Sequence, residues 1–248
     1  MLNYQIEGKG PPLLLIHGFG ISFNIWQNLR PLLRDVFTLI AIELPGIGKS
    51  SAPEGDYLEA CDREIEALRL ALKIERWSVF SYSSGTRVGE HYLQRHAEHV
   101  TKTVYLCPAQ TRAYKAAGLR IAMRWDARFP SVGNWVLSGW RLNFLVRLLG
   151  FNLYPSPHAR AWVDEISSQP VEVLKETMRS LPGHGARAFE IPSVPHLFIW
   201  GRHDLITASP RKPGLHNRVI NAAHAAPVVD AEEIAGIVER FLTLPSSE

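Results

Sequence analysis

The chain has 248 residues, of which 46% are hydrophobic and 21% are charged, an ordinary composition for a globular protein. Its 27 basic and 24 acidic side chains give a net charge of only +3. This balance excludes a highly charged disordered chain and gives no support to a dedicated nucleic-acid binder. A chain of this length buries enough surface to form a core without a disulfide or a structural metal.

The cysteines and the start of the chain bear on where the protein works. The two cysteines, Cys61 and Cys107, form no CxxC pair, so neither a disulfide framework nor a cysteine-based zinc site is expected. Residues 1–12 contain no basic segment followed by an apolar one, and no apolar run approaches the ~20 residues that cross a bilayer. We therefore expect a cytoplasmic protein that inserts into no membrane and is a monomer by default.

Short apolar runs alternate along the chain with segments of helical periodicity. The runs that predict buried strands are residues 13–17, 37–44, 77–82, 103–107, 196–200 and 219–222. Apolar residues spaced three and four apart predict helices over 58–72 and 234–242, and a further helix is expected over 86–97. Strands that are apolar throughout and separated by helices indicate an α/β fold with a mostly parallel sheet, covered on both faces.

Residues 111–191 interrupt this alternation. They contain no convincing strand and hold four of the seven tryptophans, and residues 112–190 carry 11 Lys and Arg against 6 Asp and Glu. We interpret this segment as a helical lid inserted into a core formed by residues 1–110 and 192–248. Because chemistry in such sheets belongs at the carboxyl ends of the strands, the residues that follow each strand are the candidates for a site.

Ser83 stands between a predicted strand and a predicted helix, in the sequence SYSSG. A serine nucleophile needs a tight strand-to-helix turn, with small residues two before and two after it, to lift its hydroxyl clear of the sheet. Here Ser81 and Gly85 fill those two places. Taken alone, the pattern is weak and favours a serine that merely caps the following helix.

A glycine-rich turn, HGFG at residues 17–20, directly follows the first strong strand. Such a turn can aim backbone N–H groups at the oxyanion that develops when an ester carbonyl is attacked, and one donor is worth ~3 kcal/mol of transition-state stabilisation. The backbone N–H groups of Phe19 and Ser84 are the two donors we expect.

A base and the acid that orients it must come from distant sequence. Asp204 follows the strand at 196–200, and His224 follows the strand at 219–222 and precedes the last helix. Both are therefore expected at the same sheet edge as Ser83, in the chain order Ser, Asp, His that this architecture uses. In these roles His224 accepts the proton of Ser83, and Asp204 holds the imidazole in the required tautomer.

Together these motifs resemble those of the α/β-hydrolase fold family, in its serine-nucleophile branch. The matching pieces are residues 14–20 (LLIHGFG), 43–50 (ELPGIGKS), the Ser83 turn, 199–204 (IWGRHD) and 222–225 (AAHA). The dehalogenases and epoxide hydrolases of this fold carry aspartate where Ser83 stands. The departures from the family pattern are Ser81 and Thr86, where glycine is usual, together with Glu43 for aspartate and Ala223 for glycine.

Residues 135–151 form an apolar region of the lid. They either pack the lid against the core or roof an acyl-chain slot, since such pockets are mostly apolar with a few placed polar groups. The candidate substrate-binding residues are Trp135, Trp140, Arg141, Phe144 and Arg147. The two arginines suit a substrate carboxylate or an acidic carrier, or else form a solvated basic face.

The leading hypothesis is a serine hydrolase that cleaves carboxylic esters of small or medium acyl chains through an acyl-enzyme on Ser83, with no metal or organic cofactor. The resemblance extends to short family members that cleave methyl esters of carrier-bound acyl chains of the pimeloyl type. A same-fold lyase or C–C bond hydrolase using the same three residues is an alternative, because fold does not fix chemistry. A ligand sensor without catalysis is a third.

Overall fold

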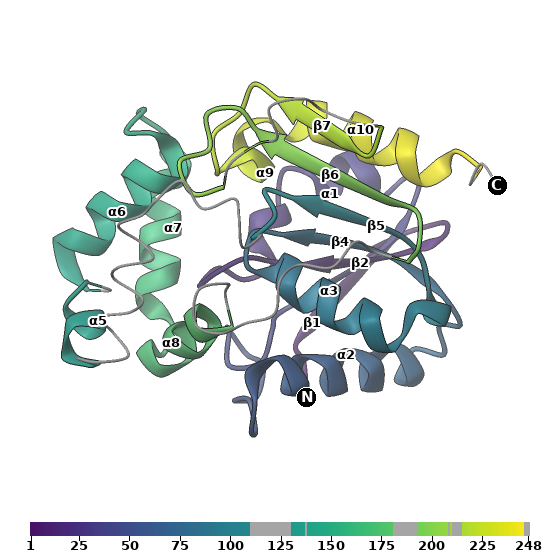
Figure 1. The fold of residues 1–248 in the computed structure, drawn as a ribbon, viewed down its shortest axis with the longest axis horizontal. Coiled ribbons are helices and arrows are strands. Elements are labelled where there is room, and N and C mark those ends of the chain that lie inside the picture. Colours follow the sequence, from purple (N-terminus) through teal and green to yellow (C-terminus); the bar gives the residue numbers. More distant parts are fainter. Residues whose placement is uncertain (110–129, 137, 181–192, 208, 210–214, 246–248) are drawn as a thin grey trace.

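A seven-stranded sheet forms the centre of the computed structural model, which describes residues 1–109, 130–136, 138–180, 193–207, 209 and 215–245 (Figure 1). The strands are β1 (Tyr4–Gly8), β2 (Pro12–Ile16), β3 (Thr38–Ile42), β4 (Trp77–Tyr82), β5 (Val100–Leu106), β6 (His196–Gly201) and β7 (Asn217–Ile220). Their order is β1-β3-β2-β4-β5-β6-β7, and every pairing is parallel except that of β1 with β3. The predicted α/β class is confirmed.

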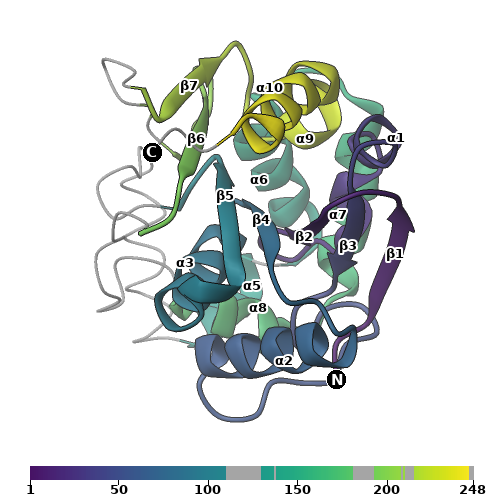
Figure 2. The ribbon, with the colours of Figure 1, turned by 90° about the vertical axis from the view of Figure 1, so that its right-hand side faces the viewer.

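Helices cover both faces of this sheet. The helical elements of the described residues are η1 (Phe23–Trp26), α1 (Arg30–Leu33), α2 (Tyr57–Ala71), α3 (Gly85–Arg95), η2 (Ala97–His99), α5 (Pro130–Val136), α6 (Gly139–Phe151), α7 (Pro157–Ser168), α8 (Val171–Arg179), α9 (Ala226–Val229) and α10 (Ala231–Thr243). Figure 2 shows α2 and α3 on one side of the sheet, with α1 and α10 on the other. Among these helices, none is both long enough and apolar enough to cross a membrane.

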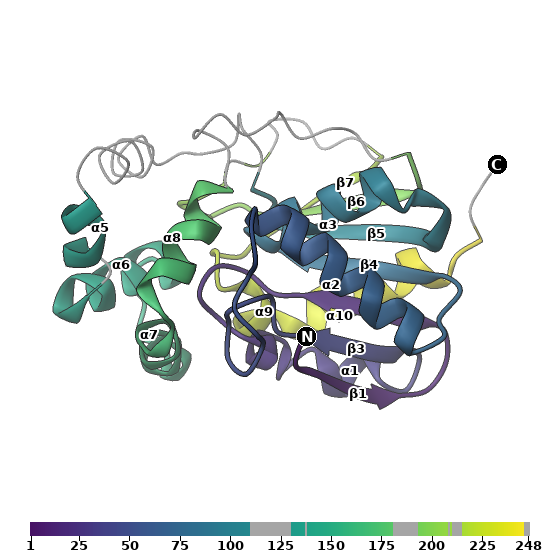
Figure 3. The same ribbon diagram turned by 90° about the horizontal axis from the view of Figure 1, so that it is seen from below.

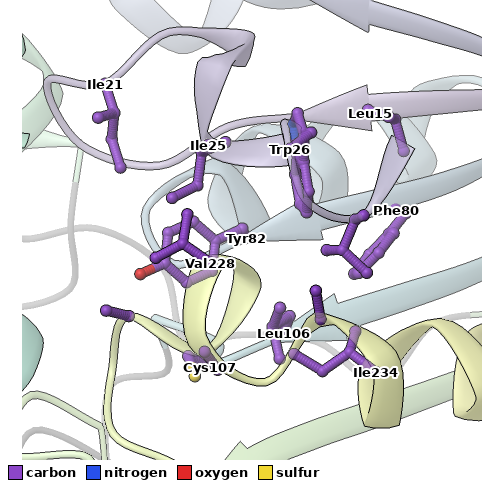
Figure 4. Close-up of a cluster of buried hydrophobic side chains, with 14 of the residues drawn as sticks. Leu15, Ile21, Ile25, Trp26, Phe80, Tyr82, Leu106, Cys107, Val228 and Ile234 are labelled. Carbon is purple, nitrogen blue, oxygen red and sulfur yellow. The ribbon is translucent and has the colours of Figure 1, made fainter. Parts of the chain in front are cut away.

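The central strands β2 and β3 are almost wholly apolar because both of their faces are buried. In β2, Leu13 and Leu15 belong to the core cluster on the α10 side, whereas Leu14 and Ile16 belong to the cluster on the α2 side. This alternation follows from the two-residue repeat of a strand. Figure 4 shows the first cluster, in which Trp26 of η1 lies against Phe80 of β4 with ring centroids 4.9 Å apart.

The helices α5–α8 lie beyond the carboxyl ends of the strands (Figures 1 and 3). The core cluster on the α10 side includes several of their buried side chains, among them Leu142, Val146 and Trp162. Polar contacts add to this packing: Glu165 of α7 accepts a hydrogen bond from the Ser22 N–H at 2.9 Å, and Gln169 accepts one from the Gly48 N–H at 3.0 Å. These helices are therefore fixed directly over the sheet edge where the candidate residues lie.

Candidate functional site

Ser83 occupies a tight turn between β4 and α3. Its backbone has φ +50°, a left-handed conformation that non-glycine residues rarely adopt and that marks a strained turn. The Ser83 N–H donates to the carbonyl of Leu106 at 2.9 Å, and the side chain remains 8% exposed. Ser83 therefore lies at the carboxyl end of β4, in the turn where this strand meets α3.

Gly85 follows the Ser83 turn because the backbone here lies very close to that of His17. A Cβ added to Gly85 would lie 2.1 Å from the carbonyl oxygen of His17, so no larger residue fits between the turn and β2. Thr86 ties the turn down: its hydroxyl donates to the Ser83 carbonyl at 2.6 Å and accepts from the Ala109 N–H at 3.0 Å. The Thr86 hydroxyl thus joins the Ser83 turn to the backbone that follows β5.

Ser81 is accommodated by a glycine on the facing helix. A Cβ added to Gly89 of α3 would lie 3.0 Å from Ser81 Oγ and 3.3 Å from Ser81 Cβ. A glycine inside a helix lowers the stability of the fold by about 0.5–1 kcal/mol relative to alanine. Gly89 is nevertheless required here, because the Ser81 side chain fills the space that an alanine methyl would need.

We expect Ser81 and Gly89 to be energetically coupled. Gly89→Ala alone is expected to destabilise the fold by about 1 kcal/mol or more through overpacking. In a Ser81→Gly background the same change is expected to stabilise it by about 0.5–1 kcal/mol through helix propensity. Urea unfolding of the four variants in this double-mutant cycle tests the coupling, and additive effects would contradict it.

His224 bridges Ser83 and Asp204. Its Nε2 atom lies 2.9 Å from Ser83 Oγ, and its Nδ1 atom lies 2.8 Å from Asp204 Oδ2. The backbone carbonyl of His224 also accepts a hydrogen bond from the Tyr82 hydroxyl at 2.7 Å. Three side chains predicted from distant parts of the sequence therefore form one continuous hydrogen-bonded chain, which can move a proton from the hydroxyl to the imidazole.

Asp204 is fully buried and its carboxylate is held on all sides. Oδ1 accepts from the Ile206 and Thr207 N–H groups at 2.7 and 3.0 Å, and Oδ2 accepts from the Thr207 hydroxyl at 2.6 Å. Burial opposes ionisation, but the charge of His224 and the hydrogen bonds from His224 and Thr207 outweigh it, so the pKa of Asp204 lies below its ordinary value. Asp204 is therefore a carboxylate at neutral pH and can stabilise a protonated His224.

The turn at residues 17–20 packs against Ser83. A Cβ added to Gly18 would lie 3.1 Å from Ser83 Cβ and 3.0 Å from the ring of Tyr82, so this turn and the Ser83 turn are in direct contact. Among the described residues, the backbone N–H groups of Phe19 and Ser84 have no hydrogen-bond partner. Both predicted oxyanion donors are thus unpaired beside the serine.

His17 holds this turn to the segment that follows β3. Its Nε2 accepts from the Leu44 N–H at 2.8 Å, which leaves Nδ1 to donate to the Gly18 carbonyl at 2.8 Å. This pattern requires a neutral ring. Burial lowers the pKa of His17 to about 4, opposed in part by the hydrogen bond to Gly18. His17 is therefore a structural residue at neutral pH.

The buried neutral His17 predicts a loss of stability in mild acid. The unfolded chain takes up the proton near pH 6.5 but the folded protein only near pH 4, so stability falls as the pH drops through this window. We expect a loss of about 2 kcal/mol by about pH 5, approaching about 3 kcal/mol below pH 4. Urea unfolding of wild type and His17→Gln between about pH 8 and 4 isolates this contribution, and identical pH profiles would contradict it.

The candidate substrate-binding residues gather on α5 and α6. Trp135 and Trp140 are 59% and 72% exposed, and the Arg141 guanidinium lies 4.1 Å from the Trp135 ring centroid and 5.7 Å from that of Trp140. Phe144 is half exposed, and Arg147 donates to the Asn143 side chain at 2.8 Å. The residues of α6 that turn toward the core are instead Leu142, Val146 and Phe151. The assignment of the five residues to substrate remains a prediction.

One group of described side chains has the donor types of a metal site. Donor atoms of Cys107, Asp204 and His224 all lie within 4.8 Å of one another. Burial, followed by the charge of Asp204, raises the pKa of the Cys107 thiol well above its ordinary value. The Cys107 thiol therefore keeps its proton at neutral pH, and His224 and Asp204 are bound to each other by a hydrogen bond of 2.8 Å, so the three groups are not a set of free metal ligands.

Comparison with known proteins places this geometry in context. A family model described as alpha/beta hydrolase fold matches residues 11–211. A pimeloyl-[acyl-carrier protein] methyl ester esterase from Vibrio vulnificus (strain YJ016) is 29% identical over 184 residues, which is 73% of this chain. The match spans 65% of that relative, slightly less than two thirds of its length.

Solved structures share the fold over almost the whole chain. A hydrolase from Oleispira antarctica superposes with a TM-score of 0.80 at 19% identity, covering 98% of this chain and 95% of that one. The enol-lactonase from Burkholderia xenovorans LB400 gives a TM-score of 0.73 at 21% identity, covering 98% and 96%. At this level of identity the likeness concerns the fold alone.

Proposed function

The chain belongs to the alpha/beta hydrolase fold family, and from this premise we propose that it is a serine hydrolase of carboxylic esters with Ser83 as nucleophile. The single observation that carries the proposal is the hydrogen-bonded chain from Ser83 through His224 to Asp204, with links of 2.9 and 2.8 Å. In this assignment His224 is the general base and Asp204 orients it and balances its charge.

The first half of the reaction forms an acyl-enzyme. His224 Nε2 takes the proton as Ser83 Oγ attacks the ester carbonyl, and Nδ1–H keeps its bond to Asp204 Oδ2. The carbonyl oxygen becomes an oxyanion, which the N–H groups of Phe19 and Ser84 stabilise. When the tetrahedral intermediate collapses, His224 returns the proton to the leaving alkoxide and the alcohol departs.

The second half releases the acid. A water molecule attacks the acyl carbonyl while His224 Nε2 accepts one of its protons. The same two N–H groups stabilise the second oxyanion. Collapse breaks the bond to Ser83 Oγ, which regains its proton from His224.

For the substrate, we propose an ester of a small or medium acyl chain, including a methyl ester on an acyl carrier. The 29% identical relative named as a pimeloyl-[acyl-carrier protein] methyl ester esterase supports this class. The helices α5–α8 act in this proposal as the described part of a lid spanning 111–191, over a core of 1–110 and 192–248. Residues 110–129, 137, 181–192, 208, 210–214 and 246–248 of this division lie outside the described residues.

Ester hydrolysis assays test the proposal. We expect turnover of p-nitrophenyl acetate, butyrate or octanoate, and of a monomethyl dicarboxylate thioester carried on acyl-carrier protein, all lost in Ser83→Ala. If no ester turns over while a fluorophosphonate still labels Ser83, the chemistry is that of a lyase or C–C bond hydrolase. If neither turnover nor labelling occurs, the proposal is wrong.

The arginines of α6 give a prediction about selectivity. If Arg141 and Arg147 attract an anionic substrate, changing each to Gln is expected to lower the kcat/KM ratio of anionic over neutral esters by about 3–10-fold, the effect of one partly exposed charge. Arg179→Gln is a matched control, since Arg179 pairs with Glu176 on the exposed part of α8. An unchanged ratio in both α6 variants would remove these residues from the substrate site.

A further inference from the structure

The carboxyl-terminal end of α6 contacts both loops that carry the proposed base and acid. The Asn152 Nδ2 group donates to the carbonyl of His203 at 2.7 Å, one residue before Asp204. The Ala225 N–H, one residue after His224, donates to the carbonyl of Gly150 at 2.9 Å. Residues 150–152 at this helix end therefore bind the residue before Asp204 and the residue after His224.

From these contacts we propose that Asn152 is a positioning residue, which couples the helices over the site to the alignment of Asp204 with His224. The inference rests on the proposed function of Ser83, His224 and Asp204. It adds a residue that lies outside the reacting groups and acts only through the backbone of the Asp204 loop.

The local backbone explains why asparagine suits this position. Asn152 ends α6 in a left-handed conformation with φ +52°, which asparagine tolerates better than most residues, and the Leu153 N–H closes the helix on the Arg147 carbonyl at 2.9 Å. A glycine would serve this cap equally well. Since the side-chain bond to His203 is not needed for the cap, it points to a second role.

The hydrogen bond from Asn152 to His203 lies only one residue from Asp204, so a change in it reaches the carboxylate directly. The His203 N–H donates to the Ala222 carbonyl at 3.0 Å, and a Cβ added to Gly201 would lie 2.7 Å from that same carbonyl oxygen. The loops before Asp204 and before His224 are thus packed directly on each other. A displacement of His203 therefore shifts Asp204 against His224, where the acceptor must stay within hydrogen-bond distance of Nδ1.

The hydrogen bond from the Ala225 N–H to the Gly150 carbonyl fixes the loop that carries His224. The last carbonyls of a helix have no partner within it, so the Gly150 oxygen is free to accept from Ala225. Gly150 also lets α6 approach α7, since an added Cβ would lie 3.3 Å from the Trp162 ring. With one bond to each loop, the end of α6 sets the separation of the two catalytic loops.

Asn152→Gly tests the role, because it keeps the left-handed cap and removes only the side-chain donor. The readout is the second-order rate of Ser83 labelling by a fluorophosphonate, which requires an aligned Ser83–His224–Asp204 chain but no knowledge of the substrate. We expect labelling to be about tenfold slower than in wild type. The kcat per Ser83 that can be labelled should fall by a similar factor, with KM changed less than about twofold. Asn152→Asp, which keeps the shape but turns a carboxylate oxygen toward the His203 carbonyl, should slow labelling at least as much.

Leu153→Gly is the matched control. Leu153 also has a positive φ of +63° and is exposed, so the change alters the same helix end without removing a side-chain hydrogen bond. We expect wild-type labelling in this variant. Wild-type labelling in Asn152→Gly, or equal slowing in Leu153→Gly, would overturn the inference. Absence of ester turnover with normal labelling of wild type would instead refute the proposed ester hydrolysis and leave this test valid.

Discussion

Replacing Ser83 with alanine is expected to lower kcat by about 10⁴-fold or more, and His224→Ala is expected to cost a similar factor. Without the hydroxyl there is no nucleophile, and without the imidazole nothing accepts its proton. Because the two groups act as one unit, the double variant should be no slower than either single variant by more than about tenfold. Initial rates with a p-nitrophenyl ester measure all three.

Ser78→Ala provides the control for this experiment. Ser78 lies on the same strand, β4, and its hydroxyl pairs with that of Thr101 at 2.8 Å, far along the strand from the site. We expect wild-type kcat in that variant. If Ser83→Ala retained even a tenth of the wild-type rate, Ser83 would not be the nucleophile.

Asp204→Asn is expected to lower kcat by about 10³–10⁴-fold with little change in KM. The Ile206 and Thr207 N–H groups bind Oδ1, so an asparagine would keep its oxygen there and present its NH₂ group to His224 Nδ1. His224 would then accept at Nδ1 and carry its proton on Nε2, facing Ser83. In that tautomer it cannot take the serine proton.

Thr207→Val separates the tautomer effect from simple disturbance of the loop. It removes only the hydroxyl that donates to Asp204 Oδ2 at 2.6 Å, so the carboxylate and the His224 tautomer are retained. We expect a loss of about tenfold or less, the value of one hydrogen bond. A similar loss in Asp204→Asn and Thr207→Val would contradict the proposed role of Asp204.

The sequence predicted six of the seven strands of the described sheet, one of them displaced along the chain. Apolar runs such as 77–82 matched β4 because both faces of a central parallel strand are buried, so their residues need no alternation. The run at 219–222 was displaced, since β7 spans Asn217–Ile220. The strand β1 was missed: it is an exposed edge strand, with four of its five residues exposed, and its residues carry no apolar run.

The residues that position the site were harder to find in the sequence. Thr207, three residues after Asp204, follows a spacing common in side-chain-to-backbone turns and was detectable in principle. The Tyr82 hydroxyl and the Asn152 amide each reach a backbone carbonyl of a loop distant in sequence, at 2.7 Å in both cases. No local pattern encodes such contacts, because they depend on how separate loops are brought together.

The orientation of α6 was likewise not readable from periodicity. Apolar residues occur on every side of this helix, so the sequence does not separate the residues that face the core from those that face outward. The packing of α6 on α7, where the rings of Phe151 and Trp162 have centroids 5.1 Å apart, decides the matter. Leu142 and Val146 are buried in the core cluster, whereas Trp140 stays exposed. The sequence showed that Arg141 and Arg147 lie in this helical segment. It did not show which side chains they contact in the folded protein.

The most direct measurement is the mass of the protein after rapid acid quenching during turnover of a p-nitrophenyl ester. The account predicts a species heavier by one acyl group, with the added mass on the peptide that contains Ser83, and none in Ser83→Ala. An acyl group on another residue, or ester turnover that persists in Ser83→Ala, would contradict it.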